Sequence, residues 1–314
     1  MSDTVSDTTA EADFVVVSNR LPVDRSPDDE GWRRSPGGLV AALEPVLQST
    51  GGAWVGWPGQ SDLDLEPFAF DGMELVPVAL SAQDVELFYE GFSNDTIWPL
   101  YHDVISPPTY HREWWDAYVR VNERFARAAA SVAASGATIW VHDYQLQLVP
   151  RLLRELRPDV VIGYFHHIPF PAYGIYSQLP WRRQVLEGLL GSDVIGFQRA
   201  ADAGNFATAV RRQLGYETKA GAIRVPTADG ARTAVARAYP ISIDAAVYDE
   251  LARRPDVQAR AREIRAELGD PAVVLFGVDR LDYTKGIGHR LKAYGELLTE
   301  QRLDKTEATL VQVA

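Results

Sequence analysis

The chain has 314 residues, of which 46% are hydrophobic and 24% charged, and this length suggests a globular protein of about two domains. With 43 acidic against 31 basic residues the formal net charge is −12, which argues against a general nucleic-acid binder and against an anionic membrane surface as partner. The absence of cysteine excludes disulfide scaffolds, cysteine-ligated zinc, iron–sulfur clusters and thiol nucleophiles.

The first thirteen residues are polar and acidic, without the basic start and apolar stretch of a signal peptide. We expect residues 1–13 to form a disordered leader and the fold to begin near Phe14. No apolar run approaches the roughly 18 residues of a membrane helix. The sequence therefore predicts a soluble, cytoplasmic protein without a membrane partner.

From Phe14 onward, strand-like and helix-like patterns alternate. Short apolar runs predict strands at 14–18, 53–57, 73–80, 138–141, 160–165 and 193–197. Apolar residues at helical spacing predict helices at 38–47, 110–134, 146–156, 182–190 and 200–214. This alternation predicts βαβ units and a mostly parallel sheet, hence an α/β fold. Residues 223–239 break the pattern, because the turn signal at 228–230 lies between two alternating runs and predicts a hairpin.

The alternation restarts after residue 240, with predicted helices at 257–268 and 288–298 and predicted strands at 272–277 and 308–313. We read the apolar run at 272–277 as a buried strand. We place a domain boundary near residue 240, giving domains at 14–240 and 241–314. Because a doubly wound domain needs about 150 residues, we expect the second domain to be incomplete.

Ligands of open α/β sheets bind beyond the carboxyl ends of the strands, so the polar residues that follow each strand are the candidates. Arg20 ends the first strand and suits a phosphate or carboxylate, although a surface arginine packed on Pro22 is an equal alternative. Gly37 and Gly38 open a helix whose amides an anion could approach, but loop glycines are common.

An aromatic-rich loop at 89–102 contains Tyr89 and Trp98, which could stack on a sugar, although local patterns favour a core role. Asp143 lies just after a predicted strand. It could bind a substrate hydroxyl or cap the following helix, and the sequence favours neither role. His166 and His167 are adjacent on one strand and should face opposite sides, so they do not suit one metal. We expect the following prolines to present His167 to the crevice, and we predict no metal site.

The segment 277–287 joins a strand to a helix and carries two cations, Arg280 and Lys285, in an otherwise acidic protein. This arrangement suits a pyrophosphate beside a helix N-terminus. Gly286 and Gly288 only begin a dinucleotide fingerprint, and the P-loop and GxSxG motifs are missing.

Seven strings occur in this order: SNRLP, SPGGL, WVGW, FYEGFSNDTIWPLYH, VHDYQLQLVP, HHIPFP and VDRLDYTKG. Together they resemble the trehalose-6-phosphate synthases, retaining GT-B glycosyltransferases with two Rossmann-like doubly wound domains facing a crevice. The resemblance covers nearly the whole chain after the leader. It implies transfer of glucose from a nucleotide-glucose, usually UDP-glucose, to glucose 6-phosphate, giving α,α-trehalose 6-phosphate and a nucleoside diphosphate.

The resemblance also implies residue roles. Arg20 looks like the residue that grips the acceptor phosphate, Tyr89 and Asp143 match contacts to the acceptor sugar, and Trp98 matches a residue that shapes its pocket. Gly37 and Gly38 face the donor, Arg280 and Lys285 match the pair that binds its diphosphate, and His167 matches a histidine beside the transferred glucose. We count Asp143, His167, Arg280 and Lys285 as catalytic candidates. The implied chemistry is a front-face attack without a carboxylate nucleophile, a metal or a cofactor.

The resemblance further implies an acidic donor-binding segment and a second phosphate-binding cation that are not found here. We therefore expect the chain by itself to be inactive. An NAD-dependent oxidoreductase is an alternative, although a complete GxGxxG is missing, and a non-catalytic sugar-phosphate sensor or regulatory subunit is another. Arg20, Asp143, Arg280 and Lys285 together favour the enzyme. The sequence leaves the nucleobase of the donor and a homo-oligomeric state open.

Overall fold

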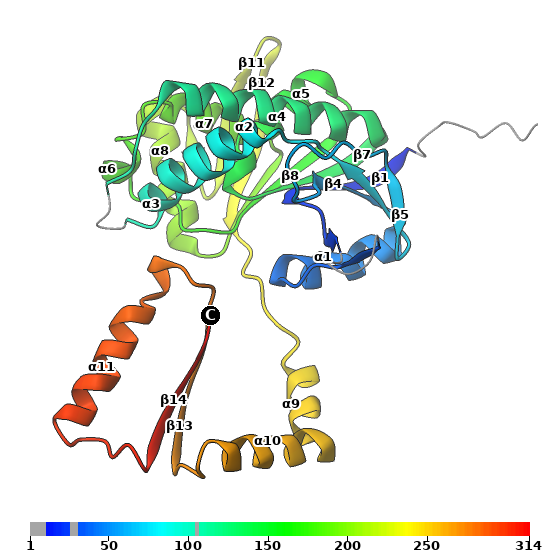
Figure 1. The fold of residues 1–314 in the computed structure, drawn as a ribbon. Coiled ribbons are helices and arrows are strands. Elements are labelled where there is room, and N and C mark those ends of the chain that lie inside the picture. The colour runs from blue at the N-terminus through cyan, green and yellow to red at the C-terminus, as the bar shows by residue number, and fades with distance from the viewer. Residues whose placement is uncertain (1–10, 26–30, 104–106) are drawn as a thin grey trace, which may run out of the picture. The chain divides into compact units, whose positions relative to one another are not determined.

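A computed structural model describes residues 11–25, 31–103 and 107–314, so the leader predicted at 1–13 lies largely outside the described residues. The chain divides into two compact units, Met1–Pro240 and Ile241–Ala314. The first strand begins at Ala12, two residues before the predicted start of the fold, because Ala12 pairs with Ala133 of a neighbouring strand. Figure 1 shows the elements along the chain.

The first unit is built on a ten-stranded sheet with the order β10-β11-β12-β9-β8-β7-β1-β4-β6-β5. Its strands are β1 (Ala12–Arg20), β4 (Ala53–Trp57), β5 (Phe68–Phe70), β6 (Met73–Pro77), β7 (Ala133–His142), β8 (Val161–His166), β9 (Val194–Phe197), β10 (Thr218–Lys219), β11 (Ala222–Thr227) and β12 (Gly230–Ala238). The pairs from β6 through β4, β1, β7, β8 and β9 to β12 are all parallel. The predicted α/β class is confirmed.

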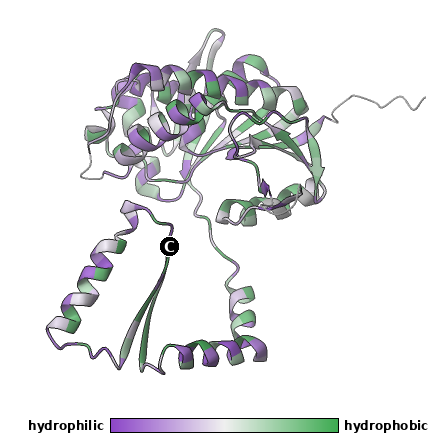
Figure 2. Ribbon diagram, viewed as in Figure 1, coloured by the Kyte–Doolittle hydropathy of each residue, from purple (hydrophilic) through white to green (hydrophobic). Residues whose placement is uncertain are grey.

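Helices lie on both faces of this sheet. They are α1 (Gly38–Thr50), α4 (Arg112–Val132), α5 (Val149–Leu156), α6 (Tyr173–Tyr176), α7 (Arg182–Leu189) and α8 (Ala200–Leu214). Side chains alternate along β1, so that Val15 and Val17 join the core with Tyr118 of α4. Val16 packs in a second core with Leu47 of α1. Figure 2 shows apolar residues gathered along the strands of this unit.

The segment expected to be an aromatic-rich loop is helical, which corrects the prediction. It consists of α2 (Ala82–Asp84), a wide π-type helix η1 (Val85–Ile97) and α3 (Trp98–Tyr101). Ring packing explains the difference. The centroid of the Phe92 ring lies 4.5 Å from that of Tyr118, and the centroid of the Phe88 ring lies 5.7 Å from it. Packing against α4 thus overrides the poor helix propensity of the aromatic residues and Gly91.

A capping box starts this helical segment. The Ser81 hydroxyl accepts from the backbone N–H of Asp84, and the backbone N–H of Ser81 donates to the Asp84 carboxylate. Burial raises the pKa of Asp84, but hydrogen bonds from Arg124 and Ser81 outweigh it and hold the pKa below its usual range. The box fixes the start of the segment that carries Tyr89 and Trp98.

Replacing Ser81 by alanine removes the hydroxyl of this box. We expect the free energy of unfolding to fall by roughly 0.5–2 kcal/mol, the usual cost of losing such a cap. Denaturant unfolding followed by tryptophan fluorescence measures the change. Ser61→Ala at an exposed position serves as control. Equal stability of the two variants would show that the Ser81 cap does not hold the segment.

The hairpin predicted at 223–239 is present as β11 and β12, paired antiparallel up to Thr227 and Gly230. It does not leave the sheet, however, because β12 also pairs in parallel with β9, with Val235 opposite Val194. A second, small hairpin of β2 (Val23–Arg25) and β3 (Trp32–Arg34) was not predicted from the sequence. Helix α9 (Ala245–Arg253) of the second unit was not predicted either.

The second unit contains α9, α10 (Pro255–Glu267), β13 (Val273–Val278), α11 (Ile287–Thr299) and β14 (Ala308–Val313), with β13 and β14 parallel. The strand predicted to be buried at 272–277 forms, but it is not buried: Phe276 is 69% exposed. An apolar run predicts a strand that can be buried, whereas burial itself needs neighbours on both sides. Among the described residues, β13 pairs with β14 alone.

Within the part of the chain that the structure describes, no helix combines the length and the apolar character that a membrane span requires.

Candidate active site

Three candidate residues, together with Trp57, lie at the carboxyl ends of neighbouring parallel strands in the first unit. Arg20 ends β1, Trp57 ends the adjacent β4, Asp143 follows β7 and His167 follows β8. Because these strands lie side by side and run in the same direction, their ends meet along one edge of the sheet (Figure 1). The topology therefore places the candidates where open α/β sheets bind ligands.

Asp143 joins the ends of β7 and β8. Its backbone has φ 73° and ψ 170°, a strained conformation that residues other than glycine rarely adopt. One carboxylate oxygen accepts from the backbone N–H of Tyr144 at 2.9 Å and from that of His167 at 3.2 Å. The predicted capping role is thus present, and the same oxygen also holds His167.

The ring of His167 contacts a second histidine at the end of β7. Nδ1 of His142 lies 3.0 Å from Nε2 of His167, and His142 is only 1% exposed. His166 points the other way, with Nδ1 3.1 Å from the Tyr164 hydroxyl inside the core, as the strand alternation predicted. His142 and His167 therefore form a pair on the opposite face of the sheet from His166.

Burial determines the charge state of these groups. It lowers the pKa of His142 well below its ordinary value, and it lowers the pKa of His167 although Asp143 acts in the opposite direction. Burial also raises the pKa of the Asp143 carboxyl, opposed by His167 and the two backbone N–H groups. Near pH 7 the two histidines are neutral, so they act through hydrogen bonds rather than as cations.

Arg20 lies over an aromatic side chain. Its guanidinium carbon is 5.1 Å from the centre of the Trp57 ring, and Nη2 donates to the Asp24 carboxylate at 2.8 Å. The Trp57 ring in turn lies 6.0 Å from Tyr89. Gly59, with φ 89°, leaves the space that the guanidinium fills, since a β-carbon there would overlap it. The structure thus brings Arg20 and Tyr89 next to the same ring, that of Trp57.

Trp98 lies behind Asp143 rather than in an open position. It is 8% exposed, and its ring is 5.5 Å from Tyr144, the residue that follows Asp143. The Tyr144 hydroxyl donates to Asn94 of η1 at 3.0 Å. Trp98 therefore supports the Asp143 segment from the helical layer.

Gly37 and Gly38 stand at the start of α1. Among the described residues, no side chain caps this end, and β-carbons at either glycine would meet no atom within 4 Å. The Ser35 hydroxyl donates at 2.7 Å to Asp24, the carboxylate that also holds Arg20. This chain of contacts ties the glycine segment to the Arg20 side chain.

Arg280 and Lys285 belong to the second unit, on the connection between β13 and α11. Arg280 is exposed and Lys285 half-buried. The acidic residues of this connection have local partners: Asp279 pairs with Arg290 at 2.7 Å, and Asp282 accepts from the backbone N–H of Thr284 at 2.8 Å. The hydrogen bond from Arg290, together with that from Gln312, lowers the pKa of Asp279. The connection thus carries two cations, and its two carboxylates accept hydrogen bonds from Arg290 of α11 and from the Thr284 backbone.

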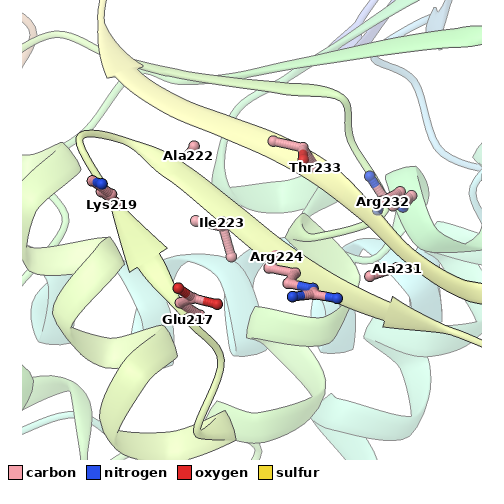
Figure 3. Close-up of a pocket in the computed structure, with 8 residues that line it drawn as sticks. All are labelled: Glu217, Lys219, Ala222, Ile223, Arg224, Ala231, Arg232 and Thr233. Atoms are coloured by element: carbon pink, nitrogen blue, oxygen red, sulfur yellow. The ribbon is translucent and has the colours of Figure 1, made fainter.

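A pocket of about 320 Å³ lies elsewhere, on β10, β11 and β12 (Figure 3). Its charged residues are Glu217, Lys219, Arg224 and Arg232. Arg232 bonds to backbone carbonyls, including that of Ser192 at 2.9 Å. The pocket contains none of the candidate residues. Among the described residues, no three His, Asp or Glu side chains are grouped as metal ligands.

Three residues of the site were missed from the sequence: Asp24, Trp57 and His142. Trp57 ends a predicted strand and His142 directly follows one, so the rule on polar residues after strands, extended to aromatic residues, could have found them. Asp24 carries no such signal, because it lies on β2 of the small hairpin that was not predicted.

The family model of glycosyltransferase family 20 matches residues 12–314. The trehalose-6-phosphate synthase of Mycobacterium avium is 57% identical over 315 residues, which cover 96% of this chain and 64% of that protein. The chain thus spans less than two thirds of the length of this relative.

Two solved structures are also similar. One, described as trehalose-6-phosphate from E. coli bound with UDP-2-fluoro glucose, has a TM-score of 0.80 and 30% identity, covering 95% of this chain and 64% of that one. The other is the UDP-forming alpha,alpha-trehalose-phosphate synthase of Burkholderia xenovorans in complex with glucose-6-phosphate. It has the same TM-score and identity and covers 96% of this chain and 65% of that one.

Proposed function

The chain belongs to glycosyltransferase family 20, and from this premise we propose that the protein transfers glucose from UDP-glucose to glucose 6-phosphate with retention. The products are α,α-trehalose 6-phosphate and UDP. The chief support is that residues of the types an acceptor sugar phosphate needs lie at adjacent strand ends of one sheet. The similar solved proteins were studied with a UDP-glucose analogue and with glucose 6-phosphate.

We assign the acceptor to the first unit, residues 14–240. Arg20 would bind the phosphate, because its fork of N–H donors matches phosphate oxygens and its side chain is 44% exposed. Tyr89 and Asp143 would contact the sugar hydroxyls. Trp98 is buried, so it would shape the acceptor pocket from behind rather than stack on the ligand.

We assign the donor chiefly to the second unit, residues 241–314, as the start of a nucleotide-sugar-binding domain. Arg280 and Lys285 would bind the diphosphate, with Gly37, Gly38 and His167 of the first unit facing the donor. In the reaction, the bond from the glucose C1 to the diphosphate oxygen breaks and a bond from C1 to the acceptor oxygen forms on the same face. The acceptor proton passes to the departing phosphate. The two cations stabilise the charge that develops on it.

The proposal needs neither a carboxylate nucleophile nor a cofactor from this chain. We also place the protein in the cytoplasm, which its lack of cysteine and its nucleotide-sugar substrate suit. Self-association is a separate proposal, and sedimentation of the purified protein tests it.

The function is tested by incubating an active-length form of the protein with glucose 6-phosphate and UDP-, ADP- or GDP-glucose in turn. We expect α,α-trehalose 6-phosphate, formed fastest from UDP-glucose. Binding of glucose 6-phosphate without transfer from any donor would instead support the sensor. Nicotinamide binding without transfer would support the oxidoreductase.

A further inference from the structure

His142 is a buried residue that has no role in the reaction proposed above. It ends β7, its ring contacts Trp140 at 4.6 Å between centroids, and its Nδ1 lies 3.0 Å from Nε2 of His167. Its other ring nitrogen, Nε2, is buried and has no hydrogen-bond partner in the part of the chain that the structure describes. Within the described residues, His167 is therefore the one hydrogen-bond partner of this ring.

His167 is held at two points. Its backbone N–H donates to the Asp143 carboxylate at 3.2 Å, and its ring Nε2 is bound by His142. Nδ1 of His167 is different, because it has no partner among the described residues and is not one of the buried unpaired atoms. This nitrogen is thus the one that the pair leaves accessible to a ligand.

The two rings must share one proton across the contact. Both are neutral because burial lowers the pKa of each. In one arrangement His142 Nδ1–H donates to His167 Nε2, which places the proton of His167 on Nδ1. In the other, His167 Nε2–H donates to His142 Nδ1, which places the proton of His142 on its buried Nε2.

The surroundings of His142 separate these arrangements. The second one buries an N–H group without an acceptor, whereas the first buries only an unpaired lone pair. In proteins, orphaned buried N–H groups are rarer than under-satisfied acceptors. The face of the Trp140 ring offers at most a weak acceptor, which does not replace a hydrogen bond.

We propose that His142 is a positioning residue that donates from Nδ1 to His167 and so fixes His167 as the tautomer with its proton on Nδ1. His167 then presents a neutral N–H donor on the accessible side of its ring. It cannot accept a proton at Nε2, because that nitrogen is occupied by His142.

The role in catalysis rests on the proposed function. If His167 lies beside the transferred glucose, its Nδ1–H donates to an oxygen of that sugar and orients it for attack. His167 is then a hydrogen-bond donor and not a general base. The tautomer itself, however, is a property of the folded chain and does not depend on the reaction.

The tautomer is measured by long-range ¹⁵N–¹H correlation spectra of the chain labelled with ¹⁵N at histidine, near pH 7. We expect the proton of His167 on Nδ1 and that of His142 also on Nδ1. A His167 ring protonated at Nε2 would overturn the proposal, whether or not the protein shows transferase activity.

Two substitutions at His142 test the cause. His142→Phe removes the donor, and we expect the proton of His167 to redistribute towards Nε2. His142→Asn places an amide N–H near the original Nδ1 and should keep His167 protonated at Nδ1. The matched control is His166→Asn, a buried histidine bonded to Tyr164 instead, which should leave His167 unchanged. If that control alters His167 as much as His142→Phe does, disturbance of the strand end is the cause and the proposal fails.

Activity gives the second readout, in a form of the protein with synthase activity. Loss of one neutral hydrogen bond corresponds to about 2- to 13-fold. We expect His142→Phe to lower kcat by about this factor with little change in the KM for glucose 6-phosphate, and His142→Asn to recover most of it. Equal losses in both variants would contradict the positioning role. If no form of the protein shows transferase activity, the proposed function fails, while the tautomer of His167 is still measured in the folded chain.

Discussion

Replacing Lys285 by alanine is expected to lower the turnover number about 100-fold in a form of the protein with synthase activity. Lys285 is half-buried on the connection between β13 and α11, where the carboxylate of Asp279 is bound by Arg290 of α11 and that of Asp282 by the backbone N–H of Thr284. Its charge is therefore available to a departing diphosphate. Because that charge develops during the reaction, the lysine stabilises the transition state more than the bound substrates. Loss of one such donor typically costs on the order of 10²-fold in rate.

Steady-state kinetics with both substrates varied measure this effect. The matched control is Lys292→Ala on the exposed face of α11, where Lys292 only approaches Glu296 at 3.9 Å. That variant should keep the parent turnover number. An unchanged kcat of Lys285→Ala would show that Lys285 takes no part in catalysis. A higher KM for the donor with unchanged kcat would show that Lys285 only binds the donor.

Arg20→Ala is expected to weaken the use of glucose 6-phosphate by about 10- to 150-fold in kcat/KM. Glucose and glucose 6-phosphate differ only in the phosphate, so discrimination has to come from cations that meet it. A hydrogen bond to a charged group is worth roughly 1.5–3 kcal/mol, which corresponds to this range. Arg20 is pre-positioned for such a bond, because Trp57 lies under its guanidinium and Asp24 fixes one of its nitrogens.

Slow hydrolysis of the nucleotide-glucose, which needs no acceptor, should change much less in this variant. Acceptor kinetics and donor hydrolysis are therefore measured side by side, with the exposed Arg33→Ala of β3 as control. If both activities of Arg20→Ala fall equally, Arg20 supports the fold or the donor site. Its assignment to the acceptor phosphate would then be wrong.

The sequence by itself determined the α/β class and most strands and helices of the first unit. This was possible because the period of apolar residues is a local property of the chain. Thus apolar and polar residues alternate on both sides of the turn signal at 228–230, and the hairpin of β11 and β12 forms where this pattern predicted it. The resemblance to one family also rests on local features, because it consists of short sequence motifs that occur in a fixed order along the chain.

Local patterns failed where packing decided the conformation or the exposure. The segment 89–102 was predicted to be a loop, yet the ring of Phe92 packs against that of Tyr118 and the segment is helical. Phe276 belongs to the strand that was predicted to be buried, yet it is exposed because β13 pairs with β14 alone among the described residues. In both cases the deciding contacts are with residues distant in the sequence.

At the candidate site, too, the sequence predicts single residues, whereas the tertiary structure determines their contacts. The sequence pointed to Arg20, Asp143 and His167 because each follows a strand. Only the tertiary structure placed Arg20 over Trp57, and only it placed His142 against His167 across 25 positions of the chain. These contacts depend on which parallel strands are neighbours and on their register, and no local pattern specifies either. The order of the strands, β8-β7-β1-β4, is what turns four separate strand ends into one site.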